Sequence, residues 1–100
     1  MSVSNKYLEK IQFALRTVST DYKIVQEITD IIEECRADMI SKGVAAKVAN
    51  AEDNYLVLGC VRSFARSRFG IDRADIETNL ADYRLQVDEL RKTVIIDEDT

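Results

Sequence analysis

The chain has 100 residues, of which 46% are hydrophobic and 32% are charged, a balance typical of one ordinary globular domain. Its net charge of −4 argues against a protein that holds nucleic acid tightly, because such a protein normally presents a basic face to phosphate. Proline is absent and glycine occurs only three times, so long stretches of backbone can form helices. These totals predict an all-α fold, a small bundle of about four helices with a short extended C-terminal tail. We expect a single domain over residues 1–100, with residues 93–100 as the tail.

Two helices are predicted in the first half of the chain. The first covers about residues 6–17, where apolar side chains recur every three or four positions. Residues 19–21 supply a cap, and the second helix then covers about residues 22–42. Gly43 stands where a left-handed helix cap is expected. Residues 44–53 are rich enough in alanine and valine to add a helical turn, but their sequence favours a linker that ends in a cap.

Two more helices are predicted in the second half. The third covers about residues 54–69 and is apolar on several sides, which is typical of a helix at the centre of a bundle. Gly59 within it costs about 1 kcal/mol relative to alanine and suggests a close approach by another helix. The fourth begins after Asp72 as a cap and carries one apolar seam, which we expect to pack on the chain's own core; contact with a neighbouring subunit is the alternative. The seam consists of Ile76, Leu80, Tyr83, Val87 and Leu90.

The sequence offers no recognisable apparatus for catalysis. It has no histidine, and its carboxylates fall on the polar sides of amphipathic helices, where nothing activates them for acid–base chemistry. Cys35 and Cys60 follow no metal or redox spacing and occupy apolar helical positions, so we interpret them as buried thiols, with a disulfide between them as the alternative. No apolar run is long enough for a membrane span, and no signal peptide is visible. We therefore expect no enzyme, no catalytic residue, no cofactor, no metal site and no membrane contact.

Four arginines at the end of the third predicted helix and just after it form the main candidate for a contact surface. Arg62 and Arg66 are four residues apart and share one side of the helix, and Arg68 and Arg73 follow them. One interpretation is a solvated surface that pairs with acidic residues of neighbouring helices. The other is contact with an acidic partner, either another subunit or DNA phosphate, where such charges set orientation and partner choice.

The segment from residue 54 to residue 77 resembles part of the small head–tail connector proteins of long-tailed double-stranded-DNA phages. In both, an apolar helix ends in an aromatic residue and glycine, here Phe69-Gly70, and a short acidic turn at residues 72–75 precedes a final amphipathic helix. The upstream layout is also similar, with a break after the first helix and a long second helix that ends at Gly43. The resemblance covers roughly residues 8–92.

The resemblance implies a structural subunit of a phage or prophage head–tail connector. In this family about a dozen copies form a homo-oligomeric ring beneath the portal protein at the capsid vertex. The ring extends the channel through which packaged DNA passes without sequence-specific binding, and it offers the attachment surface for a tail or stopper protein. The protein would then be found in the virion, after synthesis in the cytoplasm of a bacterial host. The expected subunit-interface residues are Arg62, Arg66, Arg68, Arg73, Val94, Ile95 and Ile96.

A small helical DNA-binding regulator is the alternative function. It would place the four arginines against phosphate, and its binding would depend steeply on salt. The acidic total and the lack of a clear helix-turn-helix pattern argue against it.

Overall fold

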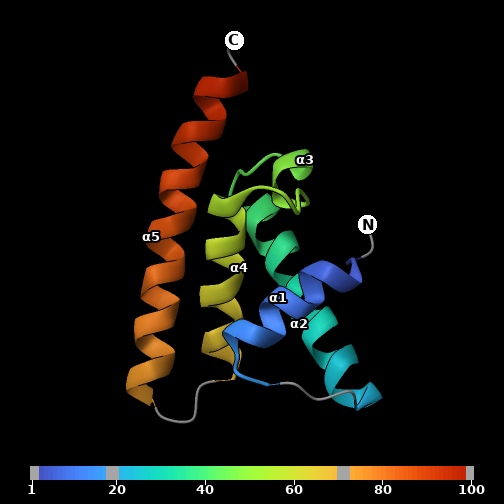
Figure 1. Cartoon of the computed structure of the whole chain (residues 1–100). Coiled ribbons are helices and arrows are strands. Elements are labelled where there is room, and N and C mark those ends of the chain that lie inside the picture. Colours follow the sequence, from blue (N-terminus) through green and yellow to red (C-terminus); the bar gives the residue numbers. More distant parts are fainter. Residues whose placement is uncertain (1–2, 18–20, 70–72, 99–100) are drawn as a thin grey trace.

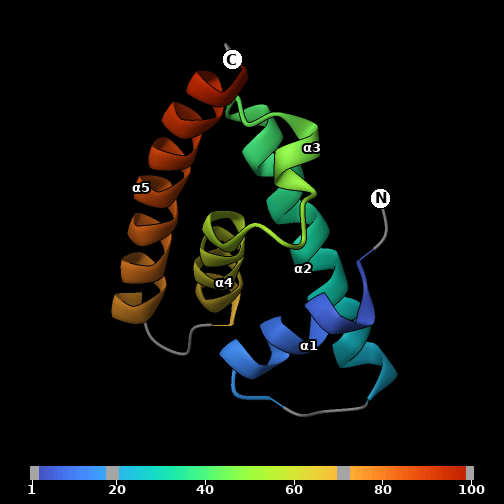
Figure 2. The same cartoon turned by 45° about the horizontal axis from the view of Figure 1, so that its top comes forward.

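A computed structural model describes residues 3–17, 21–69 and 73–98, and it describes side chains as far as Lys92. No strand occurs within these segments, so the predicted all-α class is confirmed. In Figures 1 and 2, α4 lies between α5 and α2, and α1 crosses the lower end of the bundle. The helices are α1 (Asn5–Ala14), α2 (Tyr22–Ser41), α3 (Ala46–Ala49), α4 (Tyr55–Arg68) and α5 (Arg73–Glu98).

The core forms where α4 packs against α5, α2 and α1. Val61 and Phe64 of α4 are buried in it. The rings of Phe64 and Tyr83 meet edge to face with their centroids 5.0 Å apart, which joins α4 to α5. Tyr83, Val87 and Leu90 of the predicted seam are all buried. The predictions of a central third helix and of a seam on the chain's own core are therefore confirmed.

The ends of α2 follow local signals in the sequence. Asp21 caps its start by accepting a hydrogen bond from the Lys23 N–H at 2.8 Å. Gly43 follows its end with a φ of 102°, a left-handed conformation that glycine adopts without strain. The Gly43 N–H donates to the Ile40 carbonyl at 3.0 Å, which closes the last turn. The caps predicted at residue 21 and at Gly43 are confirmed, and the cap predicted at Asp72 lies outside the described residues.

Three segments differ in detail from the sequence prediction. α1 ends at Ala14 rather than near residue 17, because Arg16 adopts a left-handed φ of 58° and its N–H donates to the Phe13 carbonyl at 3.0 Å. The predicted linker contains one helical turn, α3. The backbone of residues 93–98 continues α5, where the sequence predicts an extended tail. Each residue added to an existing helix gains a hydrogen bond, and this outweighs the weak helix preference of β-branched residues.

A polar network ties α1, α2 and the loop before α4 together. The Arg36 side chain is buried, and its guanidinium group donates to the Glu52 carboxylate at 3.1 Å and lies 5.2 Å from the Tyr7 ring centroid. Glu52 also accepts a hydrogen bond from the Ser4 N–H at 3.0 Å. Burial alone would raise the pKa of Glu52, but the bonds from Ser4 and Arg36 outweigh it and leave the pKa below its usual value. The buried arginine is therefore balanced by a carboxylate that stays ionised.

A second polar contact joins α2 to α5. The Tyr83 hydroxyl donates to the Asp38 carboxylate at 2.6 Å, and the Lys42 ammonium group donates to the same carboxylate at 2.7 Å. Burial raises the pKa of Asp38 by less than these bonds lower it, so the pKa lies below its usual value. Burial, followed by the neighbouring Cys35 and Asp38, raises the pKa of Tyr83, and its hydroxyl therefore remains a donor.

Candidate interaction surface

The outward side of α4 carries a stripe of residues that recur at steps of three or four. Residues at this spacing lie on one side of a helix. Three hollows follow the stripe from the first turn of α4 to its last, and α1 and α5 form their walls. The stripe, called the α4 face below, consists of Tyr55, Gly59, Arg62 and Arg66.

The first hollow lies between α4 and α5 and is largely apolar. Its volume is about 530 Å³, and its lining includes Leu56, Gly59 and Leu90. Tyr55 and Leu85 also line it, with 81% and 66% of their surface exposed. Burial of a large apolar side chain stabilises a contact by about 1.5–3 kcal/mol. A cluster of such exposed side chains therefore makes this hollow a candidate for contact with another molecule.

The missing side chain of Gly59 leaves space for this hollow rather than for the close approach of another helix. Among the described residues, a Cβ atom at this position would meet only the Gln86 Nε2 atom within 4 Å, at a distance of 3.8 Å. This is ordinary van der Waals contact with the end of a flexible side chain. The prediction of a close helix approach at Gly59 is therefore wrong, because the sequence shows the missing side chain but not what stands opposite it.

The second hollow lies between α4 and α1 and is basic. Its volume is about 400 Å³. Its lining includes the three cations Lys6, Lys10 and Arg62 and one carboxylate, that of Glu9. Phe13 lines the same hollow with 83% of its surface exposed. An exposed aromatic ring among cations favours a partner that combines apolar and acidic groups.

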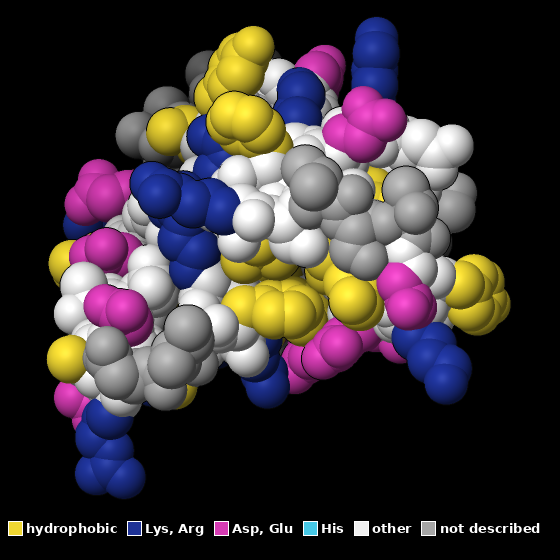
Figure 3. Space-filling model, turned by 60° about the horizontal axis from the view of Figure 1, so that its bottom comes forward, with side chains coloured by type: hydrophobic (Ala, Val, Ile, Leu, Met, Phe, Trp, Pro, Cys, Tyr) yellow, Lys and Arg dark blue, Asp and Glu magenta, His cyan; other side chains and the backbone are white. Residues whose placement is uncertain are grey.

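The third hollow lies at the last turn of α4, between the end of α1 and the first turn of α5. Its volume is about 600 Å³, and its lining includes Arg16, Arg66 and Asp75. Figure 3 views the molecule from this end and shows basic side chains grouped beside hydrophobic ones. Within the described part of the chain, neither Arg62 nor Arg66 forms an ion pair. The charges of both guanidinium groups are therefore not balanced by any described residue.

The four arginines lie close together in the sequence but on different sides of the structure. Arg62 and Arg66 share the α4 face. Arg68 lies on another side of α4 and pairs with Glu34 of α2, which is the intramolecular pairing that the sequence left open. Arg73 is exposed at the first residue of α5. The remaining candidates, whose side chains lie outside the described residues, are Val94, Ile95 and Ile96.

Side chains of this surface that are absent from the sequence-based candidates include Lys6, Lys10, Phe13, Tyr55 and Leu85. A signal for two of them exists. Phe13 and Leu85 fall outside the apolar seams of their helices, and a large apolar residue in that position is a candidate for contact with a partner. The lysines carry no such signal, because most lysines of any protein lie at the surface.

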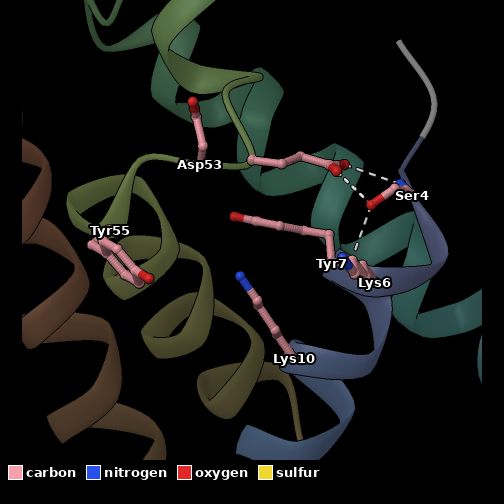
Figure 4. A pocket seen from close by; sticks show the side chains of 7 residues that line it. Ser4, Lys6, Tyr7, Lys10, Asp53 and Tyr55 are labelled. Carbon is pink, nitrogen blue, oxygen red and sulfur yellow. Dashed lines mark hydrogen bonds between the residues drawn. The ribbon is translucent and has the colours of Figure 1, made fainter.

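A fourth hollow of about 290 Å³ lies between the start of α1 and the loop before α4 (Figure 4). The Tyr7 hydroxyl points into it beside the Lys10 ammonium group, and has no hydrogen-bond partner among the described residues. Burial raises the pKa of Tyr7 to about 12, so the hydroxyl is protonated and neutral at physiological pH. The Lys10 Nζ atom lies 6.0 Å from the Tyr55 ring centroid, so this hollow adjoins the α4 face.

Both thiols lie inside the bundle. Cys35 and Cys60 are buried and free, which confirms their interpretation as buried thiols. Burial raises the pKa of both groups, to about 11 at Cys60, so neither thiol ionises readily. In the segments that the structure describes, no group of three histidine, cysteine, aspartate or glutamate residues is placed to hold a metal ion. None of the described helices has both the length and the apolar character that crossing a membrane requires.

No family model, no curated protein and no solved structure matches this chain. The α4 face and the sequence resemblance are therefore the observations from which a function is inferred.

Proposed function

We propose that the chain is a structural subunit of a phage or prophage head–tail connector ring. In this proposal, copies of the chain assemble as a homo-oligomer beneath the portal protein and extend the DNA channel. The ring then presents the surface to which a tail or stopper protein attaches, and the protein works in the virion. The resemblance over residues 54–77 motivates this particular assembly.

The observation that carries the proposal is the α4 face, where large apolar side chains and cations are exposed together. Phe13, Tyr55 and Leu85 gather along one side of α4, and the chain's own core does not use them. Their burial against a neighbour would contribute roughly 25 cal/mol for each Å² of apolar surface removed from water. The adjacent cations Arg62 and Arg66 would fix the orientation of that neighbour. This combination supports a protein that works by assembling.

The net charge supports a position around DNA. At −4 the chain repels phosphate as a whole, so duplex DNA would slide past a ring of such subunits without being held. Five cations line the two basic hollows along the α4 face, which in this proposal is covered by a neighbouring subunit rather than turned toward the channel.

The test is the molar mass of the protein by light scattering across a wide range of concentration, with electron microscopy of the heaviest fraction. We expect rings of about a dozen subunits with a central channel. A chain that stays monomeric or dimeric over the whole range would contradict a self-assembling ring.

A second candidate is a small DNA-binding regulator, because cations from α1 join Arg62 and Arg66 around the α4 face. Binding to arbitrary duplex DNA, weakening steeply as salt increases, would favour it, since each phosphate contact adds to the salt slope. No detectable binding at low salt would exclude it.

A further inference from the structure

The exposed side of α2 carries an acidic stripe with an apolar end. Asp30 and Glu33 lie in the middle of the helix, and Ile40 lies near its last turn with 41% of its surface exposed. Among the described residues, Glu33 has no ion-pair partner. The stripe, called the α2 face below, consists of Gln26, Asp30, Glu33, Ala37 and Ile40, all of which are exposed.

The α2 face and the α4 face point away from each other. The two helices pack together, and buried side chains such as Ile32 of α2 and Val61 of α4 belong to the same core. Their exposed stripes are therefore turned outward on opposite sides of the pair. In Figure 1 the chain runs upward in α2 and downward in α4.

We propose that the α2 face of one copy docks on the α4 face of the next copy, with the two helices antiparallel. The partner is thus a second copy of this chain, chosen because the two faces are complementary in charge, in apolar character and in spacing. The contact rests on the assembly proposed above, because it is the subunit contact of that ring.

The spacing of residues on the two faces matches in this orientation. Ile40 and Glu33 are seven residues apart on α2, and Gly59 and Arg66 are seven residues apart on α4, which is about 10.5 Å along each helix. When Ile40 enters the apolar hollow over Gly59, Glu33 therefore comes level with Arg66. A parallel arrangement would instead place Ile40 against the guanidinium group and Glu33 against the apolar hollow.

The charges of the two faces are opposite in the same register. Asp30 and Glu33 follow Ile40 toward the start of α2, and Glu27 lies beside them. The basic hollows of the other copy hold more cations than carboxylates. In the same register, Ala37 comes level with Arg62 of the other copy, and the small alanine side chain leaves room for the guanidinium group. Opposite charges across an interface set its register and exclude wrong partners. The charged groups that line these two hollows are Lys6, Lys10, Arg16, Arg62 and Arg66, with Glu9 and Asp75.

The arrangement also determines how copies repeat. Because α2 and α4 run in opposite directions within one molecule, an antiparallel contact between molecules keeps every copy in the same orientation. A contact between two different surfaces repeats from copy to copy, and it closes as a ring when the rotation permits. The α2–α4 contact is of this kind, so it is suited to a cyclic assembly.

The experiment uses the charge reversals Glu33→Lys and Arg66→Glu in the full-length chain. Each variant alone should self-associate at least tenfold more weakly than the wild type in analytical ultracentrifugation, because like charges then meet at every contact. An equimolar mixture of the two variants should regain the wild-type mass with equal amounts of each. In the mixture, the reversed α2 face of the Glu33→Lys variant matches the reversed α4 face of the Arg66→Glu variant. The unchanged α2 face of the Arg66→Glu variant matches the unchanged α4 face of the Glu33→Lys variant. The double variant should likewise assemble alone.

Two matched reversals at exposed positions outside both faces, Glu77→Lys and Arg84→Glu, serve as controls and should leave self-association unchanged. Far-UV circular dichroism checks that all variants keep their helix content. Single reversals that do not recover on mixing would overturn the contact, because Glu33 and Arg66 would then not meet. If each single variant still formed rings like those of the wild type, the contact would also be overturned, but the proposed ring function would stand. A wild type that stays monomeric at every concentration would overturn both.

Discussion

Two groups of charged residues, one buried inside the bundle and one on the α4 face, differ in how they are paired. On the inward side, Arg36 is 4% exposed and its charge is met by Glu52 at 3.1 Å. On the outward side, Arg62 and Arg66 have no ion-pair partner within the described residues. The difference separates a charge that is balanced inside the fold from charges that no described residue balances. It also means that substitutions on the two sides should affect different measurements.

The largest effect on stability is expected from Glu52→Ala. The substitution leaves the Arg36 guanidinium group buried without its counter-charge and removes the hydrogen bonds from Ser4. Breaking a buried pair typically costs about 3–5 kcal/mol, and because the Glu52 side chain is 29% exposed, we expect about 2–3 kcal/mol. Urea denaturation followed by circular dichroism measures this loss. Self-association at a temperature where the variant is folded should be unchanged.

Glu33→Ala is the matched control on the outward side. Glu33 is exposed and has no ion-pair partner among the described residues, so its loss should change the free energy of unfolding by less than about 0.5 kcal/mol. It should instead weaken self-association, because the α2 face loses a charge. If Glu33→Ala destabilised the chain as much as Glu52→Ala, the two sides would not differ as the structure indicates.

A smaller effect on the inward side is expected from acid. The pKa values of Glu52 and Asp38 lie below their usual values of 4.5 and 3.8, so the folded chain takes up protons at these groups less readily than the unfolded chain. Their contribution to stability is therefore complete above about pH 5 and is lost as the pH falls through the lowered values. The urea midpoint should decline below about pH 5, and Glu52→Gln should flatten the upper part of that decline. An unchanged profile would show that the Glu52 carboxylate does not stabilise the fold through its charge.

Much of the fold could be predicted from the sequence because its signals are local. The cap at Asp21, the left-handed Gly43 and the seam through Tyr83 depend on residues close together in the chain. The end of α1 could not be predicted, because Arg16 is not a residue that usually adopts a left-handed conformation. The continuation of α5 past residue 92 was missed because β-branched residues favour strands in general, yet a helix already formed can extend through them.

The candidate surface was harder to predict, because it depends on which segments lie side by side in space. The sequence identifies Arg62 and Arg66 as neighbours, since both lie on one helix. It does not show that the end of α1 brings Phe13 next to Arg62, nor that Arg68 pairs with Glu34 of α2. Charge and exposure become informative only after the packing of α1, α4 and α5 is known.

The substitution that separates the two sides most finely is Gly59→Ala. Alanine favours the helix by up to about 1 kcal/mol over glycine, and its Cβ would meet only the Gln86 Nε2 atom at 3.8 Å among the described residues. The melting temperature should therefore rise by about 4 °C. The same methyl group would partly fill the apolar hollow that receives Ile40 of the next copy, so self-association should weaken. Calorimetry and ultracentrifugation of the one variant measure both changes. A fall in melting temperature would mean that a helix does approach Gly59 closely, whereas a rise with unchanged assembly would mean that the hollow takes no part in the contact. Greater stability together with weaker assembly would show that glycine at position 59 serves the contact between copies and not the stability of the fold.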